Sequence, residues 1–153
     1  MNLPQTGGCQ CGKLRYEITE APLATYACHC RDCQRMTSSA FSLAVIVHDR
    51  AFHLSGPAPR PIERIADSGR TTIRWVCPEC ASWICSGTKP GTAAPDELRR
   101  VRAGTLDDTS WVQPSLHYFI GRKQPWVALP EGSQVFETQP TDITRYFPRD
   151  AAR

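Results

Sequence analysis

The stretch ACHCRDCQRM, residues 27–36, places Cys28, Cys30 and Cys33 within six positions. The chain of 153 residues contains eight cysteines, and three of them lie in this stretch of ten residues. Cysteines at such short spacing can hold a metal ion, carry out redox chemistry or form disulfides. The spacing of the other five cysteines helps to choose among these three possibilities.

A second group is the pair CPEC at 77–80, which follows an apolar, strand-like run. A gap of two residues lets a tight turn direct both sulfurs at one cation, and thiolates are good zinc ligands. Thioredoxin-like redox motifs share this spacing, but no βαβ pattern surrounds it here. The pair is therefore interpreted as a zinc knuckle.

A third group is CQCG at 9–12, in which the cysteines are two positions apart. In a flat strand these side chains would lie on opposite faces, so their convergence on one metal needs a turn. Gly8 and Gly12 supply the backbone freedom for such a turn. The alternative is two unrelated pairs of buried thiols. We favour a closed structural site with four sulfur ligands, from Cys9, Cys11, Cys77 and Cys80.

The three cysteines of the opening stretch then remain as a set with three ligands. Zinc takes four ligands, and an open fourth position is typical of a catalytic site that holds water or substrate. The alternative is a closed site completed by Cys85 or by a histidine. His29 lies between two ligands and is expected to point away from the metal. The other histidines reach the site only if the fold brings them near; they are His48, His53 and His117.

Composition and charge narrow the class of protein. Hydrophobic residues make up 41% and there are 13 prolines, which favours short strands and turns over long helices. The net charge is +3 with the basic residues scattered over the sequence, which supports a nucleic-acid partner only weakly. The first residues show no secretory signal, and the longest apolar run, LAVIV at 43–47, is too short to span a membrane. We expect one cytoplasmic domain over 1–153, where clustered cysteines bind metal more often than they form disulfides.

Alternation of apolar and polar residues predicts a mainly β fold of short antiparallel strands. KLRYEI at 13–18 places Leu14, Tyr16 and Ile18 on one face, and FSLAVIV at 41–47 is expected to be more deeply buried. Little helix is expected, two turns at most. The helix is predicted at 32–38, a hairpin at 61–66 and 70–76 turning at 67–69, and further strands at 82–88, 97–104 and 115–120.

The order GGCQCG, then ACHCRDCQRMTSSAF, then WVCPEC resembles the glutathione-dependent formaldehyde-activating enzyme family, which shares its domain with a centromere protein. Later segments such as RAGTLDD at 102–108 are similar too, so the resemblance runs over about 7–140. It implies a zinc-bearing β-tent fold with two zinc ions per chain. The structural zinc would lie on Cys9, Cys11, Cys77 and Cys80, and the catalytic zinc on Cys28, Cys30 and Cys33.

The resemblance also implies an activity. Members join glutathione and formaldehyde into S-hydroxymethylglutathione, formally a carbon–sulfur lyase reaction in reverse, so a small thiol and an aldehyde are the expected partners. A non-catalytic glutathione carrier, or a zinc-stabilised binding module, is the alternative. The carboxylates of glutathione would need cations nearby, and Arg31 and Arg35 flank the cysteine stretch; Arg35 is preferred. Trp83 and Trp126 could line a pocket, although aromatic residues in a β domain are usually core.

Two positions depart from the family pattern. The family commonly has glycine directly after the knuckle, where this chain has Ala81. If this backbone is left-handed, the alanine costs on the order of 1 kcal/mol. Cys85 is a thiol that the motif does not require, and it could add a sulfur to the second site.

Overall fold

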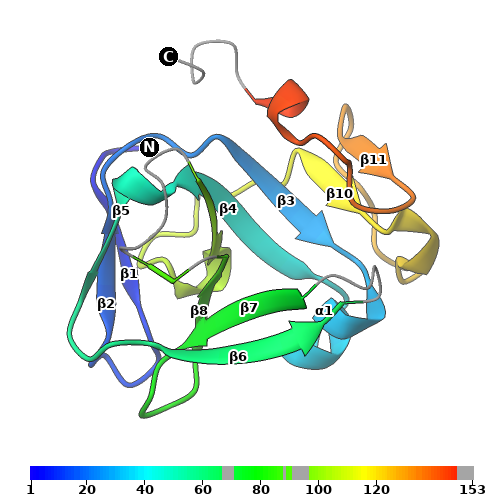
Figure 1. Cartoon of the computed structure of the whole chain (residues 1–153). Helices are drawn as coiled ribbons and strands as arrows, with labels where there is room; N and C mark the ends of the chain where they lie inside the picture. The colour runs from blue at the N-terminus through cyan, green and yellow to red at the C-terminus, as the bar shows by residue number, and fades with distance from the viewer. Residues whose placement is uncertain (67–70, 88, 91–96, 148–153) are drawn as a thin grey trace.

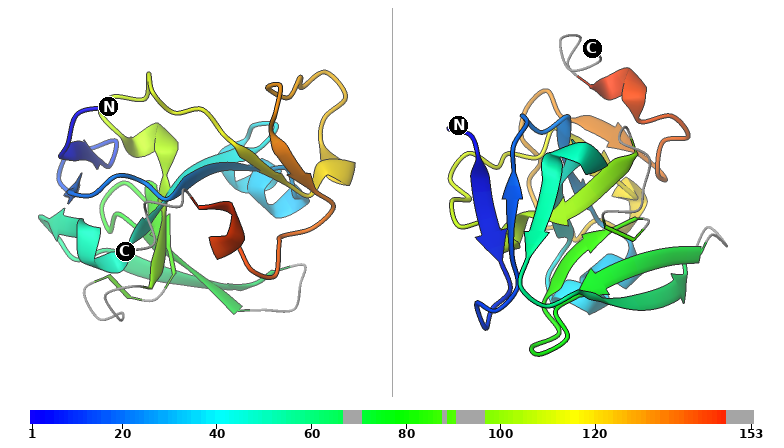
Figure 2. Two further views of the ribbon diagram at one scale, coloured as in Figure 1. Left: turned by 90° about the horizontal axis from the view of Figure 1, so that it is seen from above. Right: turned by 60° about the vertical axis from the view of Figure 1, so that its left-hand side comes forward.

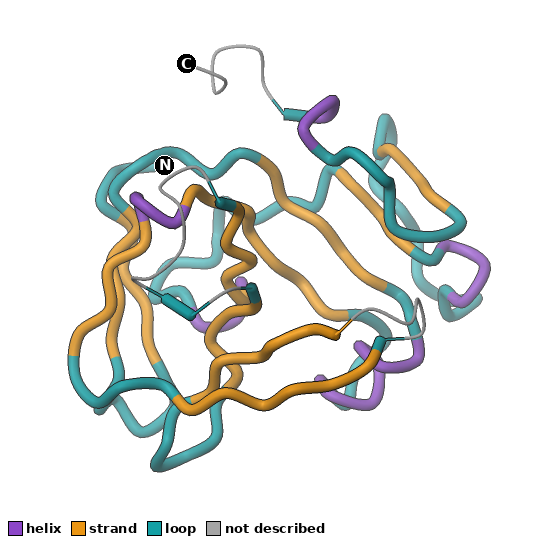
Figure 3. Tube along the Cα trace, in the orientation of Figure 1, coloured by secondary structure: helices purple, strands orange, loops and turns teal. Residues whose placement is uncertain are grey.

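The computed structural model describes residues 1–66, 71–87, 89–90 and 97–147. Short strands joined by loops dominate these residues, and helix is confined to brief segments (Figure 3). The strands are β1 (Gln5–Gly8), β2 (Arg15–Ile18), β3 (Ala24–Cys28), β4 (Ser42–His48), β5 (Phe52–Ser55), β6 (Arg60–Ile65), β7 (Thr71–Val76), β8 (Trp83–Ser86), β9 (Leu98–Arg102), β10 (Leu116–Tyr118) and β11 (Gln134–Phe136). The helical segments are α1 (Arg31–Thr37) and the single 3-10 turns η1 (Asp49–Ala51), η2 (Ala103–Thr105), η3 (Ile120–Arg122) and η4 (Thr144–Tyr146).

Two sheets make up the fold. The small sheet has the order β1-β2-β5, and the large one has the order β11-β10-β3-β4-β9-β8-β7-β6 (Figure 1). Most neighbouring strands are antiparallel, but β10 runs parallel to both β3 and β11. The prediction of a mainly β fold of short strands with little helix is confirmed.

Strand β4 lies at the centre of the large sheet, and both of its faces are buried. Val45 and Val47 point into the core shared with the small sheet, while Ala44 and Ile46 point into a second core on the opposite face. A run of β-branched residues suits this position, because each side chain packs against an apolar layer whichever way it points.

The two cores lie on opposite faces of the large sheet. The first packs Leu14, Tyr16 and Ile18 of the small sheet against the large one, as the alternation in 13–18 predicted. The second lies where the C-terminal strands and η4 approach β3 (Figure 2). It includes Tyr26 and Tyr118, whose rings stack with centroids 4.8 Å apart.

Strand β1 escaped the sequence prediction because its sequence, QTGG, has low strand propensity. Pairing explains it: β1 runs antiparallel to β2 with Gly7 opposite Tyr16. A Cβ at Gly7 would lie only 2.3 Å from the Tyr16 hydroxyl oxygen, so glycine is needed for this close approach. Strands β3, β5 and β11 were also missed, and the turn predicted at 67–69 lies outside the described residues.

In the part of the chain described, no helix has the length and apolar character needed to cross a bilayer.

Candidate metal centres and their pocket

The first candidate centre joins two distant parts of the chain. The Sγ atoms of Cys9, Cys11, Cys77 and Cys80 all lie within 4.8 Å of one another. Cys9 and Cys11 come from the turn after β1, and Cys77 and Cys80 from the turn between β7 and β8. The turns therefore bring together the four residues that the spacing assigned to one site.

Backbone hydrogen bonds shape both turns. In the first, Gly12 N donates to Cys9 O at 3.0 Å, and Gly12 has a φ of 77°, so the turn needs the left-handed backbone that glycine adopts freely. In the second, Ala81 N donates to Cys77 O at 3.0 Å. Ser82 links the two, because its Oγ accepts from Gln10 N at 3.0 Å and lies 3.2 Å from Cys80 Sγ. Through Ser82 the first turn is therefore joined to the second, beside the four sulfurs.

The sulfur distances fit a tetrahedral metal site better than disulfides. Cys9 Sγ lies 3.4 Å from Cys11 Sγ, which in turn lies 3.9 Å from Cys77 Sγ. A disulfide would need about 2.05 Å. Four sulfurs around one zinc at about 2.3 Å would lie ~3.8 Å apart. All eight cysteines are free thiols, so the four side chains are suitable soft ligands.

The second candidate centre is local in sequence. The Sγ atoms of Cys28, Cys30 and Cys33 lie within 4.8 Å of one another, at the end of β3 and the start of α1. Cys30 is the N-cap of α1, and its Sγ accepts a hydrogen bond from Cys33 N at 3.4 Å. Thus the helix start itself turns the third sulfur back toward the first two.

Crowding of the three sulfurs separates their acidities. A hydrogen bond from the Cys28 thiol lowers the pKa of Cys33 to about 3. Hydrogen bonds to Cys30 and Cys33, together with burial, raise the pKa of the Cys28 thiol far above its ordinary value. The Cys33 sulfur is therefore readily deprotonated, while Cys28 and Cys30 keep their protons. A divalent cation would remove this difference, because it would bind all three as thiolates.

Histidines do not complete either centre. Among the described residues, neither group of candidate ligands includes a histidine. His29 is fully buried and points away from the sulfurs next to it in sequence, because its Nε2 lies 3.1 Å from His117 Nδ1 and its ring packs on Phe41. The expectation that His29 points elsewhere agrees with this contact.

A pocket of about 470 Å³ opens beside the three-cysteine centre. The three sulfur-bearing residues line it together with Trp83 and Tyr118. Its charged lining consists of Arg64, Arg74, Arg100 and Arg102 with Asp32 and Glu97. Asp32 forms an ion pair with Arg64. Four arginines thus face two carboxylates and the acidic thiol of Cys33, which leaves the pocket lining with a small excess of positive charge.

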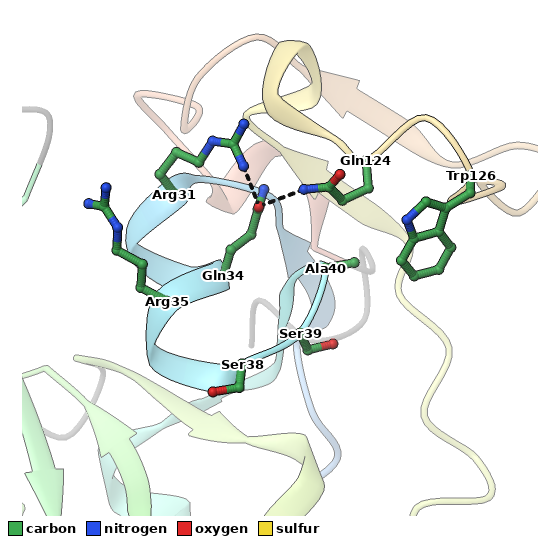
Figure 4. A pocket seen from close by; sticks show the side chains of 8 residues that line it. All are labelled: Arg31, Gln34, Arg35, Ser38, Ser39, Ala40, Gln124 and Trp126. Carbon is green, nitrogen blue, oxygen red and sulfur yellow. Dashed lines mark hydrogen bonds between the residues drawn. The ribbon is translucent and has the colours of Figure 1, made fainter.

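Arg31 and Arg35, the predicted anion contacts, lie elsewhere. They line a separate hollow on the outer side of α1, together with Trp126 (Figure 4). There Gln34 Oε1 accepts hydrogen bonds from Arg31 and Gln124, both at 2.9 Å. None of the three cysteines lines this hollow, so a role for Arg31 or Arg35 at the cysteine centre stays a prediction.

Sequence reasoning missed Arg74 and Arg102. Strand alternation was the available signal, since in TTIRWV and LRRVR these arginines fall on the polar alternate of their strands. Alternation could not show that both strands turn this face toward the cysteine stretch. The register between strands that are distant in sequence cannot be predicted from the sequence of either strand.

Comparison with known families is decisive for classification. The model of the family described as "Glutathione-dependent formaldehyde-activating enzyme" matches residues 4–122. The chain belongs to this family. Among curated proteins, none matches. A crystal structure of a Rhodobacter sphaeroides protein is similar, with 18% identity and a TM-score of 0.49, over 71% of this chain and 91% of that one.

Ala81, where this family commonly has glycine, adopts a left-handed backbone with a φ of 59°. The left-handed backbone on which the steric cost at this position depends is therefore present, and the alanine carries that cost. The next residue, Ser82, contacts the sulfur of Cys80.

Cys85, the additional thiol, lies outside both groups of candidate ligands. It is fully buried in the first core, and burial raises its pKa to about 11. Cys85 therefore behaves as an apolar core residue.

Proposed function

We propose that this chain is a zinc-dependent protein of the carbon–sulfur lyase type, which promotes the addition of a glutathione-like thiol to an aldehyde such as formaldehyde. The observation that carries the proposal is the set of three cysteine sulfurs, without a fourth protein ligand among the described residues, lining a pocket. The family description, which names glutathione and formaldehyde, supports the choice of reactants.

Two ligand sets are assigned by this proposal. Cys9, Cys11, Cys77 and Cys80 would hold a structural zinc, and Cys28, Cys30 and Cys33 a second one at the pocket. When bound, zinc supplies a positive charge that favours the thiolate form of a coordinated thiol. Three thiolate ligands exceed the charge of Zn²⁺ by one, so a strong Lewis acid is not expected.

The residues of the chain therefore contribute mainly by positioning. The pocket would hold thiol and aldehyde side by side, which replaces a bimolecular encounter in water by a local one. In the addition, a bond forms between the thiol sulfur and the aldehyde carbon, and the proton lost by the thiol ends on the former carbonyl oxygen. No oxidant or reductant is consumed.

NMR exchange spectroscopy of glutathione and formaldehyde tests the activity. We expect the exchange between free thiol and S-hydroxymethyl adduct to be faster with the wild-type protein than in buffer. A Cys33→Ser variant should lose the acceleration, whereas Cys85→Ala, which changes a thiol outside both centres, should retain it. An exchange rate equal to the background with wild-type protein would overturn the enzyme proposal.

A non-catalytic glutathione carrier is the second candidate. The charge argument favours it, because a sulfur held beside three thiolates is a weak nucleophile. The same exchange spectra separate the candidates: a carrier binds glutathione, seen as line broadening of its resonances, without increasing the rate of adduct exchange.

A further inference from the structure

One face of the large sheet carries a row of polar and basic side chains. Across the antiparallel strands, Arg74 of β7 lies opposite Ser86 of β8, and Ser86 lies opposite Arg100 of β9. Directly paired residues point to the same face, and Arg102 follows two positions after Arg100, so it also shares that face. The same register continues to Tyr26, which lies opposite Ala44, the partner of Arg102.

Arg74 is a buried cation whose main contact in the described part of the chain is an aromatic ring. Only 7% of the residue is exposed, yet among the described residues it forms neither an ion pair nor a hydrogen bond. Its guanidinium carbon lies 4.7 Å from the centre of the Trp83 ring, and the residue lines the pocket beside the cysteines. Burial, together with repulsion from the nearby Arg64 cation, lowers the pKa of Arg74, and this effect outweighs the attraction of the Cys33 thiolate and of Asp32.

Arg102 lies against the same ring and is held firmly. Its guanidinium carbon is 4.2 Å from the Trp83 ring centre. It donates to Tyr26 Oη at 3.0 Å and to Ser42 Oγ at 3.4 Å, while its buried Nε has no partner. These neutral acceptors fix the side chain without neutralising its charge, which the Cys33 sulfur at the edge of the pocket attracts.

The guanidinium groups of Arg74 and Arg102 both lie at the Trp83 ring, so they repel each other, and burial removes part of their hydration. Cation–π contacts return about 0.5–2 kcal/mol each, which is less than the cost of burying a charge without a counterion. Arg64, another cation in the pocket lining, already pairs with Asp32. The arrangement is thus suited to receive an anion, and guanidinium groups bind carboxylates through paired, parallel hydrogen bonds.

We propose that Arg74 and Arg102, packed on Trp83, form an anion subsite that holds a carboxylate of the thiol substrate beside Cys28, Cys30 and Cys33. This inference rests on the proposed function, because it takes the occupant of the pocket to be a thiol with carboxylate groups. It makes these two arginines, rather than Arg31 and Arg35, the residues that select an anionic thiol over a neutral one.

Calorimetric titration with S-methylglutathione tests the subsite without using the thiol. This ligand keeps both carboxylates but has no free sulfur to bind at the cysteine centre. Arg74→Gln should weaken binding about 10- to 100-fold, because one charge-assisted interaction is lost. Arg74→Lys should recover part of the affinity, since it retains the charge but not the planar geometry. Arg60→Gln, an exposed arginine on the same β6–β7 hairpin, is the matched control and should bind like wild type.

A second arm leaves the protein unchanged. The dimethyl ester of S-methylglutathione has no carboxylates and should bind the wild-type protein at least ten times more weakly than the parent compound. Equal affinity of wild type and Arg74→Gln, or of ester and parent compound, would overturn the inference.

The outcome is separable from that of the proposed function. If Arg74→Gln weakens binding while the exchange spectra show no acceleration by wild-type protein, the anion subsite stands and the enzymatic proposal fails. Zinc content measured on the same samples should be equal in wild type and Arg74→Gln. A loss of zinc in the variant would instead assign Arg74 to balancing the thiolate charge and overturn the subsite.

Discussion

Ala81 combines an L-side chain with a left-handed backbone directly after a candidate metal ligand. Its Cβ approaches the carbonyl oxygen that follows, at a cost of roughly 1 kcal/mol. The N–H of the same residue closes the knuckle by donating to Cys77 O. The position is strained, but the hydrogen bond that shapes the turn is kept.

Ala81→Gly is expected to raise the free energy of unfolding by up to about 1 kcal/mol, because glycine removes the steric cost at this φ. Urea denaturation of both proteins at equal zinc content measures the difference. Ala24→Gly is the control; it lies in β3 with ordinary strand geometry and should lower stability by about 0.5–1 kcal/mol. A loss of stability in Ala81→Gly would contradict the strain argument.

The Cys85 thiol predicts a pH dependence. Its pKa is about 11 in the folded protein against 9.0 as its ordinary value, because burial disfavours the thiolate. Between these values the unfolded chain releases the proton and the folded one keeps it, so the stabilisation is complete below pH 9 and lost as pH rises toward 11. Relative to Cys85→Ala, which cannot ionise, wild type should lose about 2 kcal/mol of unfolding free energy over this range. Chemical denaturation across this pH range measures the difference. If the unfolding free energies of wild type and Cys85→Ala changed with pH in parallel, the predicted contribution of this thiol would be refuted.

At the scale of the elements, β4 joins the two cores. Ile46 is fully buried in the second core, while its neighbours Val45 and Val47 are buried in the first. A strand with one polar face could slip by one residue only by exposing its apolar set. Here both faces are apolar, so the register comes from pairing with β3 and β9.

Ile46→Ala is expected to lower the free energy of unfolding by about 2–5 kcal/mol, since it leaves a cavity in the second core. The matched control is Ile65→Ala on the edge strand β6, where 71% of the residue is exposed and the change should stay within about 0.5 kcal/mol. Thermal or urea unfolding measures both. Similar losses in the two variants would show that β4 is not buried as described.

Local patterns predicted some elements and missed others for identifiable reasons. The alternation around Tyr16 predicted β2, and the apolar run around Val45 predicted β4, because those signals lie within the strand itself. Strand β1 contains Gly7 and Gly8 and exists through its pairing with β2, which no local pattern reveals. The sequence therefore predicted only part of the fold, because many of its strands are defined by pairing with segments that are distant in sequence.

At the scale of the whole molecule, the two candidate centres differ in what they connect. The four-cysteine centre ties residues 9–11 to residues 77–80, whereas the three-cysteine centre lies within 28–33. Cysteine spacing was enough to sort seven cysteines into these two groups of candidate ligands, since the members of each pair or triplet lie within a single short segment. The pocket arginines could not be sorted in this way, because β7 and β9 meet the cysteines only through the sheet order.

Single substitutions should reveal this difference. With the two zinc ions per chain that the proposed function assigns, Cys33→Ser is expected to lower the zinc content from two to about one and to keep the native fold. Cys77→Ser should also lose one zinc but destabilise the protein strongly, since the bound metal contributes its affinity to the stability of the segments that it joins. Elemental analysis and circular dichroism check both variants. Equal destabilisation would show two structural centres instead.

The sequence separation within the four-cysteine centre also has a consequence for biosynthesis. While the chain leaves the ribosome, Cys28, Cys30 and Cys33 are available together as soon as one short segment has emerged, but Cys11 must wait for residues 77–80. Closing the longer loop carries a greater entropic cost, and synthesis proceeds at about 5–20 residues per second. Under the proposed function, the three-cysteine centre is therefore complete and ready to bind its metal several seconds before the four-cysteine centre, which joins the N-terminal turn to residues 77–80.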